Sequence, residues 1–353
     1  MSAITGSRTT SWRLDAITAT GQHVARLALR DGSGSHDWSL DAEVPLSFRA
    51  DIGPRILTDD GAPTDIPLPE LGGLWLRATH RIRQGDDVAD HVVATGPITG
   101  APRHLAVGET VRLRGMDPTR LLQRAGLRAR LTLPTGTPIA ETVTSLIAAH
   151  APSVRADIGD TDETLREALS YDPGAPVLPV VNALLAAAGY TALAPRRDGV
   201  LWSRRWLPPS QRPITLTFDR RAEAPYLPDL ELDDDAFARP DEVIARTRGS
   251  QDSPALVGRW PDYAPPDAIT EVIDVEAATI EAATLQARQH WTERQMVTRE
   301  TEIDGPWQPI DPGAIARFAF DRHGVDLLTE VRSLGTTWDQ RGSTRFRLRG
   351  VTP

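Results

Sequence analysis

The sequence predicts a mainly β protein with an α/β insert, in which two related β-barrels flank a small α/β domain. Three observations support this. Short apolar stretches with alternating polarity fill the first and last thirds of the chain, and helical spacing is confined mainly to the middle. The four residues Arg-Leu-Arg-Gly close both β-rich regions, at 112–115 and 347–350. The length of 353 residues also exceeds what one small core organises, which favours several domains.

The first region reads as a set of short strands separated by turns. Residues 12–60 alternate apolar and polar side chains and break at a Gly- and Ser-rich turn. Residues 58–73 are rich in Pro, Gly and Asp and are predicted to form a loop. A hairpin over 74–98 and a strand over 110–115 complete the region. We therefore expect residues 1–118 to form the first barrel.

Helical signals begin near residue 118 and define the insert, predicted to span 119–207. Thr137 is the expected N-cap of a helix that has Pro138 at its first position. A second helix is expected over 176–188, ended by Gly189. A hairpin around Asp198-Gly199 follows, and two prolines mark the end of the insert.

The last region returns to β patterns. Residues 210–235 are expected to rejoin the first barrel, and residues 236–353 to form the second. This second barrel is predicted to carry a long helix, about 275–293, capped by Asp274. In each β region a strand–turn–strand unit precedes the Arg-Leu-Arg-Gly segment, which favours a duplicated barrel.

Catalytic and metal-binding motifs are missing from the sequence. The chain has no Cys, which excludes disulfides, thiolate nucleophiles and zinc–thiolate sites, and it has no nucleotide-binding glycine loop or zinc-protease motif. We therefore predict no enzyme, no catalytic residue, no bound cofactor and no metal. Three sets of residues could bind a metal ion, but solvated side chains are the competing interpretation for each. They are the pair His80 and His91; the run Asp229, Glu231, Asp233, Asp234 and Asp235; and the group Asp157, Asp160 and Asp162.

The charge balance limits the possible partners. The formal net charge is −9, and all 39 basic residues are arginines. This excess of acids argues against general nucleic-acid binding, which needs a basic surface. No run of 18 apolar residues occurs, so we expect no membrane span, and the first 13 residues do not look like a signal peptide.

Several segments of the sequence, and the order in which they follow one another, resemble the tail-hub family. This family comprises minor tail or tail-tip proteins of long-tailed phages of actinobacteria. It is related in fold to the baseplate hubs of contractile tails. The segments that carry the resemblance are Trp12-Arg13-Leu14-Asp15, the hairpin from Leu74 to Ile98, the strand 111–117 leading to Pro118 and Leu121-Leu122, the helix 176–188 with Gly189-Tyr190 and the hairpin to Trp202, residues 239–245, and residues 309–315. Asp241 and Ala314 depart from the residues usual in the family.

The resemblance implies a structural role in a virion. It implies a homotrimer whose six barrels surround a channel and adapt a six-fold tail tube to a three-fold tip. The expected neighbours are a distal tail protein and the tail tube above, tip or fibre proteins below, and a tape-measure protein in the channel. DNA would pass through without specific binding. Assembly would take place in the cytoplasm of the host bacterium. We expect an acidic or neutral channel wall, with arginines mainly at subunit contacts. Candidate contributors to the wall are the turns Asp86-Asp87 and Asp321-Arg322 and the run Asp233 to Asp235.

Two other functions remain open from the sequence. One is a polysaccharide or cell-wall hydrolase, which would need a carboxylate pair in a cleft. The other is a carbohydrate- or receptor-binding module at the tail tip, which would need exposed aromatic residues. Burial of Trp75, Trp202 and Trp206 would argue against the second.

Overall fold

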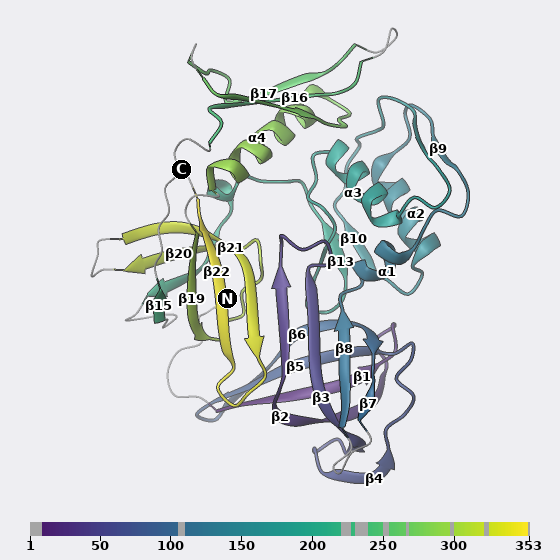
Figure 1. Cartoon of the computed structure of the whole chain (residues 1–353), viewed down its shortest axis with the longest axis vertical. Coiled ribbons are helices and arrows are strands. Elements are labelled where there is room, and N and C mark those ends of the chain that lie inside the picture. Colours follow the sequence, from purple (N-terminus) through teal and green to yellow (C-terminus); the bar gives the residue numbers. More distant parts are fainter. Residues whose placement is uncertain are drawn as a thin grey trace.

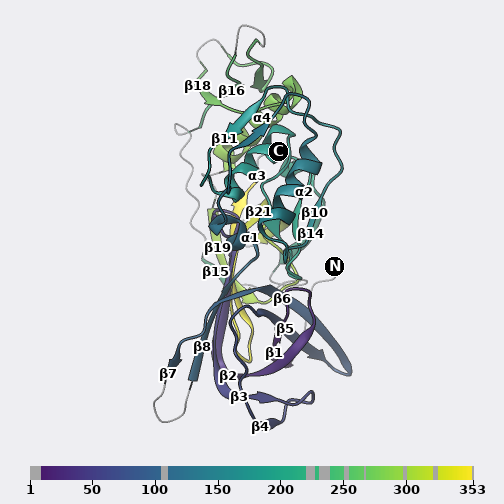
Figure 2. The ribbon, with the colours of Figure 1, turned by 90° about the vertical axis from the view of Figure 1, so that its right-hand side faces the viewer.

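The computed structural model describes residues 9–104, 110–219, 227–229, 239–249, 254–265, 268–296, 300–320 and 325–351. A β-barrel made by the N-terminal strands occupies one end of the elongated molecule, and a second β unit lies beside it (Figure 1). The helical insert and a further α/β unit form the other end, as the rotated view also shows (Figure 2). Among the described helices, none is long and apolar enough to cross a bilayer.

The first barrel consists of six strands that close on themselves. The neighbour order is β2-β1-β5-β6-β8-β3, and a β2–β3 ladder completes the circle. The two short strands β4 and β7 extend β3 and β8. The bounds are β1 Thr9–Ile17, β2 His23–Ser39, β3 Leu46–Leu57, β4 Pro63–Pro67, β5 Trp75–Gln84, β6 Asp87–Gly100, β7 Arg103–His104 and β8 Thr110–Met116.

The second β unit repeats the neighbour order of the first. Its strands follow as β14, β20, β21, β22, β19 and β15, matching β1, β5, β6, β8, β3 and β2 in that sequence. One difference is that β14 runs parallel to β20, whereas β1 runs antiparallel to β5. The bounds are β14 Ile214–Asp219, β15 Leu227–Asp229, β19 Glu300–Pro306, β20 Ile315–Phe320, β21 Val325–Thr337 and β22 Ser343–Gly350.

The two Arg-Leu-Arg-Gly segments lie in matching strands. Each is in the third strand of an antiparallel meander, β5-β6-β8 in the barrel and β20-β21-β22 in the second unit. Leu113 and Leu348 point inward and are 0 % exposed, while the arginines beside them point outward. Because side chains alternate along a strand, the same four residues place the same pattern in both β units.

The insert has an apolar core of its own, into which Ile17 and Trp75 of the barrel also pack. Its helices α2 and α3 pack on each other, and their apolar faces supply much of this core. The bounds are α1 Thr119–Arg124, β9 Leu131–Leu133, α2 Ile139–His150, β10 Ala156–Ile158, β11 Leu169–Tyr171, α3 Val177–Ala187, β12 Ala194–Pro195 and β13 Leu201–Ser203, with a 3-10 turn at Pro209–Gln211.

A small α/β unit interrupts the second β unit. Helix α4 packs on a three-stranded sheet of order β17-β16-β18 around Val243, Ala245 and Ala287. Its bounds are β16 Glu242–Arg246, β17 Val257–Trp260, β18 Thr270–Asp274 and α4 Ile280–Met296.

The predicted fold class is confirmed, but two of the domain assignments are wrong. Residues 214–219, expected in the first barrel with 210–235, form β14 and pair with β20 of the second unit. Phe218 packs there on Phe346, with ring centroids 5.2 Å apart. Residues 236–353 are not one barrel, because 242–296 form the separate α/β unit. Alternation of apolar and polar residues identifies a strand but not the strand with which it pairs, which explains both errors.

Smaller differences concern a loop and two helix starts. The predicted loop 58–73 contains β4, a short edge strand with a proline at each end. Pro138, not Thr137, is the N-cap of α2. The long helix starts five residues later than predicted, at Ile280, because the Thr279 hydroxyl accepts from Ala282 N–H. Asp274 instead ends β18 and pairs with Arg246.

Matched truncations in the two meanders test whether they have equal roles. Leu113→Ala and Leu348→Ala should each lower the free energy of unfolding by about 2–5 kcal/mol, because both side chains are fully buried. Val88→Ala, at a position 49 % exposed near the β5–β6 turn, is the control and should cost about 0.5 kcal/mol or less. Urea unfolding measures all three, and a near-neutral result for either leucine would contradict the equivalence.

Candidate functional site: the junction between the two β units

The histidines and acids considered as metal ligands in the sequence are not gathered into a group of three or more in the described residues. His80 and His91 do lie opposite each other across the β5–β6 hairpin, as expected. Their rings contact the indole of Trp307, with centroid distances of 5.1 Å in both cases. No group of three or more potential ligands occurs in the described part of the chain. The two histidines are therefore packing residues of the barrel.

The acidic candidates have different positions. Asp157 accepts from Arg196 and Arg204 at 2.7 Å each, and these bonds lower the pKa of its carboxyl group. Asp157 lies in β10, and Asp160 and Asp162 lie in the segment that follows it. Of the acidic run, only Asp229 lies within the described residues, at the end of β15. Glu231, Asp233, Asp234 and Asp235 lie outside them.

An open hollow of about 480 Å³ lies in the insert and is lined by Asp157, Asp160, Tyr190 and Arg204 among others. Since Arg204 is already bonded to Asp157, this hollow offers no free cation–carboxylate pair from these two residues. Trp75 and Trp206 are buried at 6 % exposure, and Arg196 covers the ring of half-buried Trp202. These three tryptophans do not form a sugar-binding platform.

The two β units meet through contacts between segments about 300 residues apart in the chain. Residues 35–39 of β2 pair antiparallel with 333–337 of β21, which makes one sheet from the two units. Next to this ladder, Trp338 N–H donates to Gly34 O at 2.7 Å. A Cβ atom on Gly34 would lie 2.1 Å from the Trp338 ring, so only glycine leaves room for this indole. We call this region the junction.

His36 is the polar centre of the junction. Its Nδ1 accepts from the Trp338 indole N–H at 2.9 Å, and its side chain is 1 % exposed. Burial lowers the pKa of His36 to about 3, and the charge of Arg197 contributes in the same direction. The ring is therefore neutral at physiological pH, as a hydrogen-bond acceptor at Nδ1 must be.

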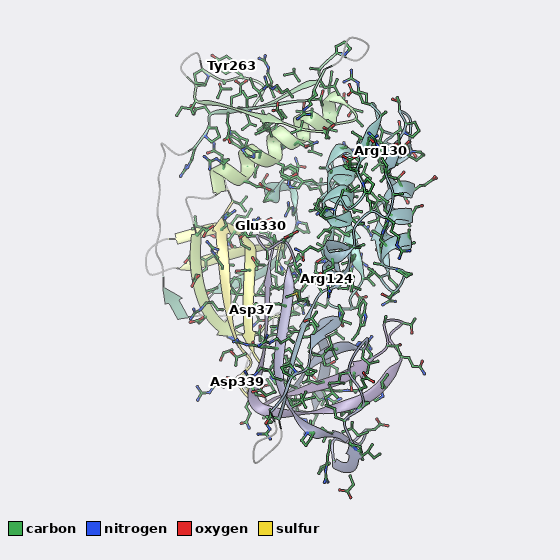
Figure 3. The ribbon with its side chains drawn as sticks, turned by 45° about the vertical axis from the view of Figure 1, so that its right-hand side comes forward. Asp37, Arg124, Arg130, Tyr263, Glu330 and Asp339 are labelled. Atoms are coloured by element: carbon green, nitrogen blue, oxygen red, sulfur yellow. The ribbon has the colours of Figure 1, made fainter. Side chains whose placement is uncertain are left out.

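Stacked aromatic rings continue the junction into the barrel. Trp12 stacks on His80 with a centroid distance of 4.1 Å and lies 5.6 Å from Trp338. Its indole N–H donates to Asp339 O at 2.8 Å, which ties β1 to the β21–β22 turn. In Figure 3 Glu330, Asp37 and Asp339 follow one another along this junction.

Two arginines, Arg197 in the insert and Arg212 in the segment that follows it, bond to the second β unit. Arg197 lies over the Trp307 ring at 5.1 Å and bonds Asp311 and the carbonyl of Ile310. Arg212 donates to the Glu330 carboxylate at 2.7 Å, and Glu330 is 4 % exposed. Arg332 also donates to Glu330 at 3.0 Å, so this buried carboxylate is paired on both sides.

Asp117 fastens the start of the insert to the barrel. One carboxylate oxygen accepts from Leu46 N–H at 2.7 Å, and the other accepts from the backbone N–H and hydroxyl of Thr119. Burial raises the pKa of the Asp117 carboxyl group, and these hydrogen bonds oppose that shift. These bonds give Asp117, at the end of the strand that leads into the insert, a structural role.

Sequence reasoning missed the junction. Gly34 and His36 lie in a Gly/Ser segment that reads as a turn, and Trp338 follows a polar stretch. The arginines were expected mainly at subunit contacts, yet many pair within the chain, as in Arg81–Asp90 and Arg317–Asp326. Of the acids expected at the channel wall, Asp86 and Asp87 are exposed at the β5–β6 turn. Asp321-Arg322 and Asp233 to Asp235 lie outside the described residues.

Solved structures share this fold over nearly the whole chain. A tail protein of Neisseria meningitidis is 17 % identical with a TM-score of 0.65, covering 97 % of this chain and 96 % of its own. The 43 kDa tail protein of prophage MuSo2 of Shewanella oneidensis is 12 % identical with a TM-score of 0.61, covering 96 % and 97 %.

An E. coli component of the type VI secretion system, described as similar to the T4 bacteriophage tail proteins gp27 and gp5, is 12 % identical. Its TM-score is 0.52, and the match covers 96 % of this chain and 77 % of that one. No protein-family model and no curated protein matches the sequence. The chain therefore has the fold of phage tail and secretion-system proteins.

Acid should weaken the junction through His36. The unfolded histidine binds a proton near pH 6.5 and the folded one only near pH 3, so the unfolded state binds more protons in between. Stability should therefore fall as the pH falls through this window, by up to about 1.4 kcal/mol per pH unit.

Thermal unfolding from pH 7.5 to 4.5 measures this slope. His36→Gln keeps an acceptor for Trp338 but cannot titrate, so it should flatten the slope. His150→Gln, at the end of α2, is the control for removing a histidine elsewhere. An unchanged slope in His36→Gln would assign the acid sensitivity to other groups.

Asp117→Asn should destabilise the protein although the side chain keeps its size. An amide has only one acceptor oxygen, so its NH₂ group would face either Leu46 N–H or the Thr119 backbone N–H. The expected loss is about 1–3 kcal/mol in the free energy of unfolding. Asp172→Asn, at a side chain 86 % exposed, is the control and should be neutral. Equal stabilities of the two variants would refute the anchoring role of Asp117.

Proposed function

We propose that the protein is a structural tail-hub subunit of a phage or phage-derived tail tip. The observation that carries this proposal is the whole-length likeness to tail proteins, which extends through both β units and the insert. The proposed assembly is a homotrimer, in which three copies with two β units each would form a six-membered ring around a channel. Such a ring would adapt a six-fold tube to a three-fold tip.

The junction suits this role. A subunit that supplies two neighbouring members of a ring must hold them at a fixed angle. Here one apolar core runs through both β units, and it includes Leu113, Trp338 and Leu348. Arg197, Arg212 and Asp117 then fix the insert to both units. Each copy would therefore enter the ring as one rigid body.

The partners and the place of action belong to the same proposal. A distal tail protein and the tail tube would lie above the ring, tip or fibre proteins below it, and a tape-measure protein in the channel. DNA would pass without specific binding, along an acidic or neutral wall. The protein would assemble in the host cytoplasm and act in the virion, and an actinobacterial host stays a prediction.

We infer a structural rather than an enzymatic role, because the similar solved structures are named as tail or secretion-system components. Neither rival function has a specific observation in its favour. Trp75 and Trp206 are buried, which weakens the case for a carbohydrate platform.

The oligomeric state of the purified protein tests the proposal. Native mass spectrometry should find a trimer of about 116 kDa, which is three times the chain mass of 38.5 kDa. Cryo-electron microscopy of particles should find three copies at the tail tip. A stoichiometry other than three or six there, or degradation of cell walls by the purified chain, would contradict the proposal.

A further inference from the structure

One outer sheet face crosses both β units without interruption. It is formed by the outward positions of β8, β3, β2, β21, β22, β19 and β15, in that spatial order. We call it the shared outer face, and its strands lie side by side at the centre of Figure 1. Most charges on it are neutralised across neighbouring strands, as in Arg112 with Asp51 at 3.2 Å and Arg345 with Asp304 at 3.0 Å.

Two arginines at the barrel end of this face lack such an ion pair in the described residues. Arg49 on β3 lies directly opposite Arg114 on β8, and both side chains are exposed. Arg49 donates to the Ser35 hydroxyl at 3.0 Å, and neither arginine has a carboxylate within 4.0 Å in the described residues. Like charges directly opposite each other destabilise a sheet, so this pair weakens the isolated subunit.

The surface around the arginine pair is covered by small residues. Its register neighbours are Ser35 beside Arg49 and Gly100 beside Arg114. A Cβ atom on Gly100 would meet no other atom within 4 Å. The two guanidinium groups therefore rise above small residues, where carboxylates from outside can reach both.

An exposed acidic residue, Glu302, lies near the other end of the shared outer face. Glu302 on β19 is exposed and lies in register with Arg347 on one side and Asp229 on the other. Arg347 does not pair with it, because its guanidinium bonds Glu300 instead, through Nε at 2.8 Å. In the described residues Glu302 has no ion-pair partner within 4.0 Å.

These two ends cannot neutralise each other within one chain. Strands β2, β21 and β22 lie between β3 and β19, so about 19 Å of sheet separates the strands of Arg49 and Glu302, at about 4.8 Å per strand. The described residues thus place an arginine pair on one β unit and the exposed carboxylate of Glu302 on the other. Opposite charges placed in this way suit a head-to-tail contact between copies, the type of contact that closes into a ring.

We propose that Arg49 and Arg114 of one copy pair with Glu302 of the next copy. The inference rests on the proposed ring and names the contact that would set its direction. A second copy fits better than DNA, because the site holds only two arginines and the chain carries a net charge of −9, which repels a polyanion. Arginine also suits this contact, since its planar guanidinium binds carboxylates in a bidentate manner.

Charge reversal on the full-length chain tests the contact. The double variant Arg49→Glu/Arg114→Glu should weaken assembly about 10- to 100-fold, measured as the concentration at which trimers dissociate in sedimentation experiments. Glu302→Arg alone should also weaken it. The triple variant, which reverses both sides, should restore assembly, and the wild-type contact should weaken with added salt.

The matched control is Arg124→Glu/Arg128→Glu, which reverses two exposed arginines of the insert; Arg124 is labelled in Figure 3. It should assemble like the wild type. Circular dichroism checks that each variant is folded, and Arg49→Ser/Arg114→Ser serves as a milder second variant.

Two results would overturn the inference while leaving the ring intact. One is normal assembly of the double variant, and the other is a triple variant no better than the double. Loss of duplex DNA binding with unchanged assembly would assign the arginines to DNA instead. Failure of the wild-type chain itself to form trimers would instead contradict the proposed function, and the inference with it.

Discussion

The structure depends most on the close approach of Trp338 to Gly34 at the ladder between β2 and β21. The absence of a side chain at position 34 lets the indole reach the interior, where it donates to His36 and lies beside Trp12. Because these contacts are buried, the two β units share one core and cannot move independently. A Cβ atom at position 34 would clash with the Trp338 ring, so this contact requires glycine.

The remaining parts of the molecule are attached through buried polar groups. Asp117, Glu330 and Arg197 each join segments far apart in the chain, and each is satisfied by more than one partner. A buried carboxylate that loses its partners costs more than an apolar contact of the same size, so these bonds fix the geometry strongly. This is the property that a ring-forming subunit requires, since small errors in angle would prevent closure.

The arginines have a different role from the one the composition suggested. With no lysine in the chain, planar guanidinium groups pair with carboxylates on adjacent strands and neutralise the outer faces of the sheets. Arg49, Arg114 and Glu302 are then informative exceptions, because none of them has an ion-pair partner within 4.0 Å in the described residues. A surface of paired charges also keeps edge strands soluble without favouring indiscriminate association.

The sequence by itself determined the local elements and the class of fold. Alternation identified most barrel strands, apolar spacing identified the helices near 139–150 and 177–187, and the repeated Arg-Leu-Arg-Gly segments marked matching strands. It also excluded thiol chemistry outright. Only the tertiary structure decided that 214–219 joins the second unit, that 242–296 folds separately, and that His36, Gly34 and Trp338 meet. The physical reason is that periodicity reports which face of an element is buried, whereas strand partners and contacts over 300 residues apart depend on how those faces pack together.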